Sequence, residues 1–283
     1  MTASPTTGQS ERLLIIAPGR SERNYWLDLW AYRELLAILA WRDLAVRYKQ
    51  TFIGVAWSVV RPLLTLVIFT ILFSRVAKLP SVGTTPYPVM VLAGLLPWTL
   101  FSSILNEAAN SLITNANLIG KVYFPRLIIP TATTAVAFVD FLIAFVILLA
   151  LMLWFGFAPD WRIALLPAFV LLGILTALGP ALIMTTMNVK YRDFRYVLPF
   201  VMQFGLYVSP VGFSSAVIPD AWRLLYSFNP VVGVIDGFRW CVLGGQAPFY
   251  WQSFTIAIVE TIVFLWIGVR YFRSAERTFA DLI

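Results

Sequence analysis

Long uninterrupted apolar stretches dominate this chain, and they limit what it can fold into. A helix needs about 20 apolar residues to cross the hydrocarbon core of a bilayer, and several stretches here are longer. Only helices and closed barrels satisfy their backbone groups in lipid, and a barrel strand would alternate apolar and polar residues. These stretches do not alternate, so the sequence predicts an all-α membrane protein.

The composition agrees with this fold class and excludes several functions. Hydrophobic residues make up 60% of the chain and charged residues only 12%, against about 25% charged residues in soluble domains. A single cysteine and the absence of histidine exclude a disulfide framework and most zinc or haem sites. The net charge of +7 is dispersed between apolar stretches, which argues against binding of nucleic acid.

We expect six membrane-spanning helices. They cover about residues 53–77, 87–113, 127–157, 163–187, 194–213 and 250–272, within a membrane domain over 32–283. The polar residues 1–31 are predicted to be a mobile cytoplasmic tail. Residues 32–50 are expected to form an interfacial helix on the cytoplasmic surface, with a plain solvated linker as the alternative. Residues 219–245 are broken by proline and glycine, which favours short re-entrant helices between spans five and six.

The distribution of lysine and arginine predicts the orientation. Fifteen of them lie in the N-terminal region, in the loops after the second and fourth spans, and in the C-terminal tail. Five lie in the other loops, and Arg61 lies inside the first span. Because cytoplasmic loops carry the excess of positive residues, both termini are placed in the cytoplasm, as an even number of spans requires.

The sequence contains no recognisable catalytic constellation. Acidic residues occur in three spans, as Glu107, Asp140 and Glu260. Each could be a proton or cation site, or could simply pair with a partner inside the bundle. The pair Gly120-Lys121 lacks the other glycine and the following Ser or Thr of a phosphate-binding loop. We therefore expect a protein that is not an enzyme, binds no cofactor itself and does not bind ATP by that route.

The loop after the second span carries an unusual concentration of apolar side chains. Leu118, Ile119, Tyr123 and Phe124 are expected to form an exposed knob between the capping asparagines and Pro125. Exposed apolar patches usually mark a binding partner, although such a loop can also fold back on the membrane interface. The knob is therefore a candidate docking surface.

Several segments, in this order, resemble the permeases of ABC type-2 polysaccharide exporters, which serve O-antigen and capsule export. They are Trp41–Trp57 leading into Arg61-Pro62, Gly94–Ser103, Leu118–Arg126, Asn188–Arg195 with Pro199, Tyr207–Pro210, and Asn229-Pro230. The resemblance covers nearly the whole chain from about residue 28. The chain departs from the usual pattern at Gly120, where relatives often have a basic residue, and at Arg61, where many have glutamine.

The resemblance implies a homodimeric pore in the bacterial inner membrane that translocates a lipid-linked polysaccharide. Two copies of a separate cytoplasmic ATPase subunit, which binds ATP and Mg, would drive it. The residues expected to couple to that ATPase are Asn117, Leu118, Ile119, Lys121, Tyr123, Phe124 and Arg126. Alternatives are a permease of the same type for teichoic acid, a lipid or a drug, and an ion-coupled secondary transporter using Asp140 or Glu260.

Two further groups are expected to contact the substrate. Arg42, Arg47 and Lys49 could bind the pyrophosphate of a lipid-linked glycan, since guanidinium groups bind phosphate in bidentate fashion. They could also simply anchor the chain to anionic lipids. Aromatic rings can stack on the C–H faces of sugars, so Phe69, Phe73, Trp98, Phe101, Phe204 and Tyr207 are candidate channel residues. Ordinary packing or lipid contact is the alternative for each ring.

Overall fold

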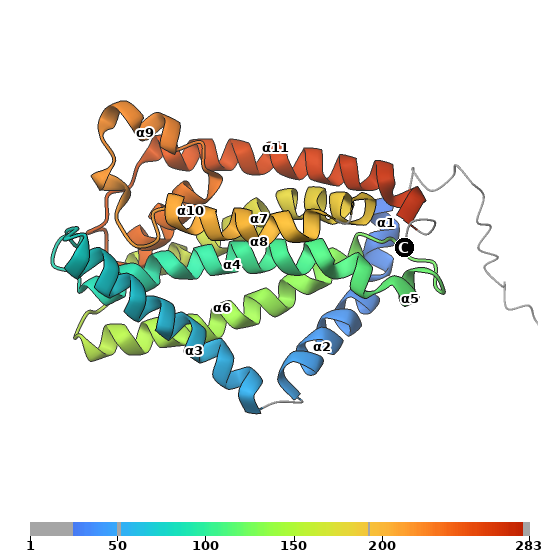
Figure 1. The fold of residues 1–283 in the computed structure, drawn as a ribbon, viewed down its shortest axis with the longest axis horizontal. Helices are drawn as coiled ribbons and strands as arrows, with labels where there is room; N and C mark the ends of the chain where they lie inside the picture. The colour runs from blue at the N-terminus through green and yellow to red at the C-terminus, as the bar shows by residue number, and fades with distance from the viewer. Residues whose placement is uncertain (1–24, 50–51, 192, 280–283) are drawn as a thin grey trace, which may run out of the picture.

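The computed structural model describes residues 25–49, 52–191 and 193–279, and within these ranges the chain is helical without strands (Figure 1). Most of the predicted tail lies outside the described residues. Its last part, Tyr25–Ala31, forms helix α1, and the mobility predicted for residues 1–31 stays a prediction. Tyr25 is buried and anchors the start of this helix to the rest of the protein.

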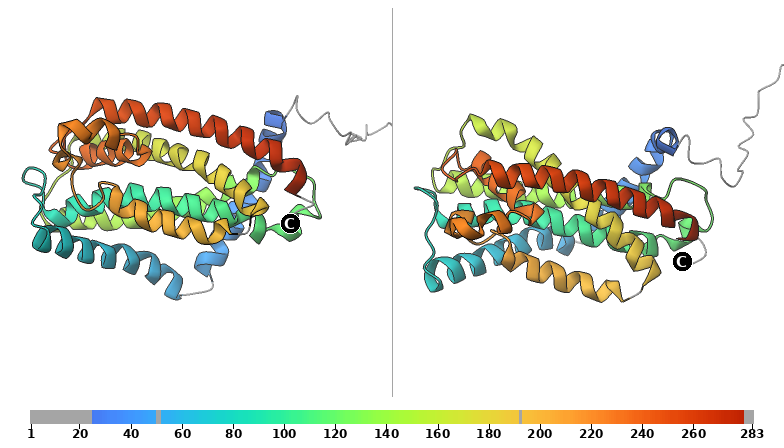
Figure 2. Two further views of the ribbon diagram at one scale, coloured as in Figure 1. Left: turned by 45° about the horizontal axis from the view of Figure 1, so that its top comes forward. Right: turned by 90° about the horizontal axis from the view of Figure 1, so that it is seen from above.

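Four long helices run side by side along the molecule: α4 (Tyr87–Thr114), α6 (Ile128–Trp154), α7 (Leu166–Lys190) and α11 (Trp251–Ala275) (Figures 1 and 2). Helix α3 (Phe52–Phe69) continues into a π-helical segment, η1 (Thr70–Val76), on the outside of this bundle. A short 3-10 helix, η2 (Trp161–Leu165), leads into α7. Helix α4 packs against α6, α7 and α10 (Pro230–Val242), which makes it the centre of the fold.

Among the described residues, five helices are long and apolar enough to span a membrane. They cover 56–76, 87–114, 128–154, 161–190 and 251–275, close to five of the predicted spans. The predicted span over 194–213 is helical only as α8 (Phe194–Val208), whose 15 residues rise about 22 Å. That length falls short of the hydrocarbon core of about 30 Å.

Helix α8 and the residues that follow it together nevertheless carry the chain from one end of the bundle to the other. Lys190, the last residue of α7, lies over the ring of Tyr271 near the end of α11. Helix α11 begins at the opposite end, where Arg162 hydrogen-bonds the carbonyl of Gly244. The chain therefore crosses the length of the bundle a sixth time through α8 and the residues that follow it.

The segment between α8 and α11 folds into η3 (Ser215–Val217), α9 (Asp220–Tyr226) and α10, grouped at one end of the bundle (Figure 1). Helix α10 packs among α4, α7 and α11, and most of its side chains are buried. Arg239 of α10 donates hydrogen bonds to the carbonyls of Met90, Val211 and Phe213. Short helices are present here as expected, and their re-entrant position in a membrane stays a prediction.

Helix α2 (Arg33–Lys49) corresponds to the predicted interfacial helix 32–50 and packs on α6. The axes of α2 and α3 meet at a steep angle, and the first residues of α2 lie towards the end of the bundle that holds α5 (Ala116–Ile119) (Figure 1). The short η4 (Glu276–Thr278) follows α11 at the same end. Arg273 lies 4.5 Å from the ring centre of Tyr25, so the first and last described segments meet there.

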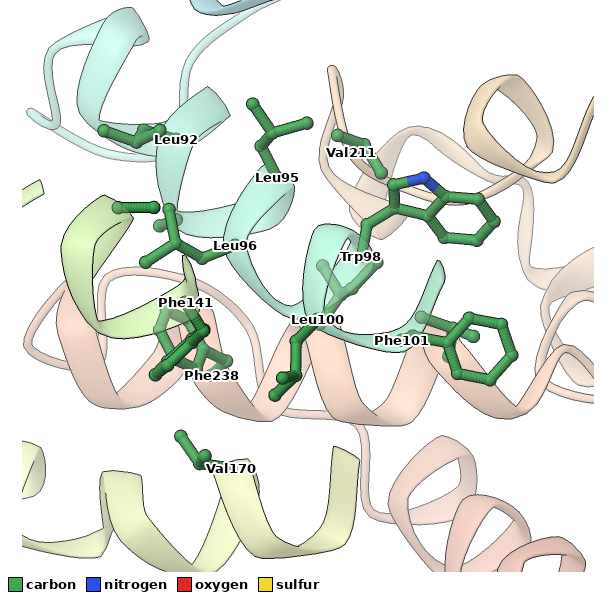
Figure 3. Packing of buried hydrophobic residues seen from close by; sticks show 14 of the residues in the cluster. Leu92, Leu95, Leu96, Trp98, Leu100, Phe101, Phe141, Val170, Val211 and Phe238 are labelled. Atoms are coloured by element: carbon green, nitrogen blue, oxygen red, sulfur yellow. The ribbon is translucent and has the colours of Figure 1, made fainter. Parts of the chain in front are cut away.

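The core is built on α4, whose side chains meet α6, α7 and α10. Figure 3 shows Leu92, Leu96 and Leu100 among rings and aliphatic side chains from these neighbours. Helices α7 and α11 approach so closely at Gly179 and Gly268 that a side chain on either residue would strike the backbone of the other helix. Small residues at such crossings are typical of helices that pack within membranes.

Candidate functional site: a polar cavity and the loop after α4

Arg47 of α2 binds two carboxylates that are far apart in the sequence. Its guanidinium donates to Glu107 of α4 at 2.9 Å and forms a salt bridge to Asp140 of α6 at 2.7 Å. Asp140 also accepts hydrogen bonds from Tyr48 and from Ser58 of α3, the latter at 3.1 Å. This polar cluster ties four helices together, and it pairs two of the three acidic residues that the sequence placed in spans.

The hydroxyl group of Tyr48 is held as a hydrogen-bond donor in this cluster. Burial, together with the neighbouring Asp140 carboxylate, raises the pKa of Tyr48 to about 12. The phenol therefore keeps its proton at neutral pH and donates it to Asp140. Sequence reasoning missed Tyr48 and Ser58 because nothing in their local pattern indicates that Asp140 lies beside them.

A cavity of about 440 Å³ opens beside the polar cluster, between α3, α4 and α6. Charged and hydroxyl side chains line part of it and apolar side chains the rest. Residues that line it include Arg47, Trp57, Ser58, Arg61, Thr65, Thr99, Ser102, Ser103, Asp140 and Phe141. A mixed lining of this kind can hold an anionic or hydroxyl-rich ligand at the edge of the bundle.

The three predicted head-group residues differ in their partners. Arg42 is bound to Asp43 and Asn115, each at 2.7 Å. Arg47 lines the cavity, but its guanidinium is occupied by Glu107 and Asp140. Lys49 is exposed, and no ion pair to another described residue involves it. The three cations therefore have different surroundings in the structure.

The loop after α4 is only partly exposed. Tyr123 is 57% exposed, and Asn117, Lys121 and Val122 also face outward. Phe124 is only 4% exposed and Ile119 is buried too, so the prediction that both belong to an exposed knob is wrong. Leu118 is partly buried against the same cluster. The apolar side chains differ in exposure because Ile119 and Phe124 pack in one cluster with Tyr25, Phe272 and Phe279, from the first and last described segments.

Contacts with the C-terminal segment hold the loop in place. The backbone N–H of Arg126 donates to the Glu276 carboxylate at 2.7 Å, and its guanidinium donates to the Glu276 carbonyl. Phe124 belongs to a buried cluster that includes Phe272 and Phe279. Burial raises the pKa of Glu276, and the hydrogen bond from Arg126 partly opposes this rise. These contacts tie the loop to the segment that follows α11.

The six predicted channel aromatics fall into two groups. Phe69, Trp98 and Phe101 are buried inside the chain, and Phe73 is partly buried against Phe69. Trp98 packs directly against Gly205 of α8, which explains its burial. Phe204 and Tyr207 are exposed on α8, and Tyr196 and Phe200 extend this exposed face.

These features are those of a multi-pass membrane protein with a polar cavity at the edge of its bundle. Residues 34–243 match the ABC-2 type transporter family, and the chain belongs to that family. In the described part of the chain, no three His, Cys, Asp or Glu residues gather as metal ligands.

Similar proteins extend over nearly the whole chain. It is 27% identical over 260 residues to an O-antigen export system permease protein of Myxococcus xanthus, covering 90% of this chain and 98% of that protein. An O-antigen export system permease protein of Klebsiella pneumoniae is 27% identical over 254 residues, 88% of this chain and 95% of its own. A polysialic acid transport protein of Escherichia coli is 28% identical over 242 residues, 83% and 91% of the two chains.

Proposed function

We propose that this chain is the membrane-spanning subunit of an exporter that carries a lipid-linked polysaccharide across the bacterial inner membrane. The observation that carries the proposal is the similarity, over 83–90% of the chain, to permeases and transport proteins named for O-antigen and polysialic acid. A separate cytoplasmic ABC ATPase, two copies per two copies of this chain, supplies the energy. The chain itself is not an enzyme and needs no cofactor of its own.

In this proposal the end of the bundle that holds α1, α5 and η4 faces the cytoplasm. Both described termini lie at that end, and the positive residues of the sequence favour the same orientation. A reporter fused after Ile283 is then active only in the cytoplasm, and one inserted near Thr84 only outside. The opposite pattern would contradict the orientation without affecting the family.

The exposed edge of the loop after α4 is the proposed docking surface for the ATPase. Tyr123, Val122 and Lys121 present an apolar patch with a positive charge, and Asn117 lies beside them. The less exposed residues of the loop support this patch and are proposed to transmit its movement to α11; they are Leu118, Ile119, Phe124 and Arg126. Burying Tyr123 against a partner is worth on the order of 1.5–3 kcal/mol before ordering costs.

The exposed aromatic face of α8 is proposed to line the polysaccharide pathway between two copies of the chain. Phe200 and Phe204 stack with 6.4 Å between ring centres, and Tyr207 continues the row towards Phe69, 6.1 Å away. Ring faces can bind the C–H surfaces of successive sugars without requiring one glycan sequence. Lys49 at the end of α2 and Arg42 in the middle of the same helix are proposed to attract the anionic head group towards the bundle.

The proposal is tested with the chain co-expressed with a cytoplasmic ABC ATPase from the same genome. Tyr123→Ala should weaken binding of the ATPase at least tenfold and abolish surface polysaccharide, while the melting temperature of the purified chain stays unchanged. Phe124→Ala is the matched control and should lower the melting temperature instead, because its ring is buried. Export that persists without the ATPase, or that an uncoupler stops directly, would contradict the proposed mechanism.

A further inference from the structure

The cavity between α3, α4 and α6 contains a second arginine that the polar cluster does not neutralise. Arg61 lies nine residues into α3 from Phe52, which places it about 13 Å along the helix axis from that end. It lines the cavity and lies 5.6 Å from the ring centre of Trp57, one turn earlier. A cation at such a position inside an apolar span is costly unless a partner compensates its charge.

Asp140, the carboxylate that lines the cavity, already accepts hydrogen bonds from other residues. Asp140 accepts from Arg47 with one oxygen and from Tyr48 and Ser58 with the other. Glu107 accepts from Arg47 as well. Among the described residues, Arg61 forms no salt bridge and no hydrogen bond, so its five N–H donors are available to a ligand.

The hydroxyl groups with which α4 lines the cavity offer hydrogen-bond acceptors instead of charge. Thr99 donates its hydroxyl hydrogen to the Leu96 carbonyl at 2.9 Å, and Ser102 donates to the Thr99 carbonyl at 3.2 Å. Each hydroxyl thereby satisfies its donor within α4 and keeps oxygen lone pairs for a ligand. Lone pairs on hydroxyl oxygens accept hydrogen bonds from sugar hydroxyls, whereas a phosphate needs donors.

We propose that this cavity is a binding site for a glycosyl phosphate, with Arg61 binding the phosphate and Thr99 and Ser102 receiving the attached sugar. The planar guanidinium binds two phosphate oxygens at once, and the Trp57 ring holds its plane in place. Arg47 is then a positioning residue that shapes the cavity through Glu107 and Asp140. This assignment deepens the proposed function and rests on it, because an exported lipid-linked glycan carries this chemical group.

Binding of defined probes to the purified chain in phosphatidylcholine nanodiscs tests the site. The probes are a polyprenyl pyrophosphate bearing one N-acetylglucosamine, the same lipid without sugar, inorganic pyrophosphate, and phosphatidylglycerol. We expect the sugar-bearing lipid to bind most tightly. Arg61→Gln should weaken it at least tenfold, and Arg61→Lys should weaken it about threefold because charge remains but the planar fork is lost. Thr99→Val should remove the advantage of the sugar and leave the bare lipid bound as before.

Arg75→Gln is the matched control, since it removes an exposed arginine from the π-helical continuation of the same helix. It should leave all four affinities unchanged. The proposal is overturned if Arg61→Gln and Arg75→Gln bind every probe like the native chain. The proposal is also overturned if inorganic pyrophosphate or phosphatidylglycerol binds as tightly as the sugar-bearing lipid, because the site would then bind any free anion or bulk lipid.

Export measured in parallel separates the site from the proposed function. Native binding and native export in Arg61→Gln would reject the site and leave the exporter assignment standing. Tight, Arg61-dependent binding in a native chain that exports no glycan would reject the exporter assignment and leave the site standing. A melting temperature of Arg61→Gln equal to or above the native value shows that lost binding is not lost folding.

Discussion

Helices α3 and α4 are nearly equally apolar, yet the protein uses them in opposite ways. In α4, 78% of the most apolar stretch is buried within the chain, whereas in α3 only 11% is buried. Helix α4 is surrounded by α6, α7 and α10, while α3 contacts the bundle along one edge and borders the cavity. Apolar character therefore indicates membrane insertion for both helices but says nothing about which one holds the fold together.

The difference has a direct consequence for the exposed side of α3. Leu64, Val67, Ile68 and Ile71 face away from the chain. In a membrane these side chains contact lipid or a second copy, so they contribute little to the stability of one chain. The cavity, Arg61 and the aromatic face of α8 all lie on or beside this loosely packed side. Function would thus be concentrated where packing is weakest, which leaves room for movement.

The largest effect is expected from adding bulk to α4 where it meets α10. A side chain at Gly94 would strike the Arg239 guanidinium and the Val211 carbonyl. Gly94→Val should therefore cost about 3 kcal/mol or more, from overpacking and from the hydrogen bonds that Arg239 would lose. Thermal unfolding in detergent measures this loss.

Ala56→Val is the control on α3, because Ala56 is exposed. Its stability should stay within about 0.5 kcal/mol of the native value. Equal losses from the two substitutions would break the distinction between the helices.

A matched pair of leucines sharpens the same comparison at intermediate magnitude. Leu92 of α4 is fully buried, and Leu64 of α3 is half-exposed. Leu92→Ala should cost about 2–5 kcal/mol, since it leaves a cavity in the core. Leu64→Ala should cost less than about 1 kcal/mol in the isolated chain. If Leu64→Ala becomes equally costly only in the assembled transporter, a second copy covers this side of α3.

Apart from the two controls on α3, the smallest loss of stability is expected at the polar cluster that joins the two helices. Arg47→Gln should destabilise the chain by about 1–2 kcal/mol, because Asp140 and Glu107 lose a cation that is only partly screened by solvent. In a double-mutant cycle with Asp140→Asn, the combined loss should be clearly smaller than the sum of the two single losses. Additive losses would show that Arg47 and Asp140 do not interact.

Arg47→Lys separates positioning from recognition at the same residue. The positioning role predicts that lysine restores most of the stability and export, since one ammonium can still pair with Asp140. A direct role in binding the head group predicts that export stays low although stability recovers, because the planar fork is absent. Glycan export and thermal unfolding, measured on the same preparations, decide between the two.

The sequence by itself determined the membrane class, the approximate helix boundaries and the resemblance to polysaccharide exporters. Each of these depends on local properties, namely the length of an apolar stretch, the distribution of positive charge and the order of short segments. The predicted spans 87–113 and 250–272 agree with α4 and α11 to within a few residues.

Tertiary structure alone decided which polar and aromatic side chains meet. Arg47, Glu107 and Asp140 are separated by 33 to 93 positions in the chain, and nothing local signals their convergence. Phe124 and Trp98 are buried, whereas Tyr123 and Phe204 are exposed. The sequence predicted the same role for Phe124 as for Tyr123, and the same role for Trp98 as for Phe204. The physical reason is that residues in an apolar span look the same whether they face lipid or protein. Only the packing of neighbouring helices distinguishes Arg47, which is paired with two carboxylates, from Arg61, which has no ion pair to another described residue.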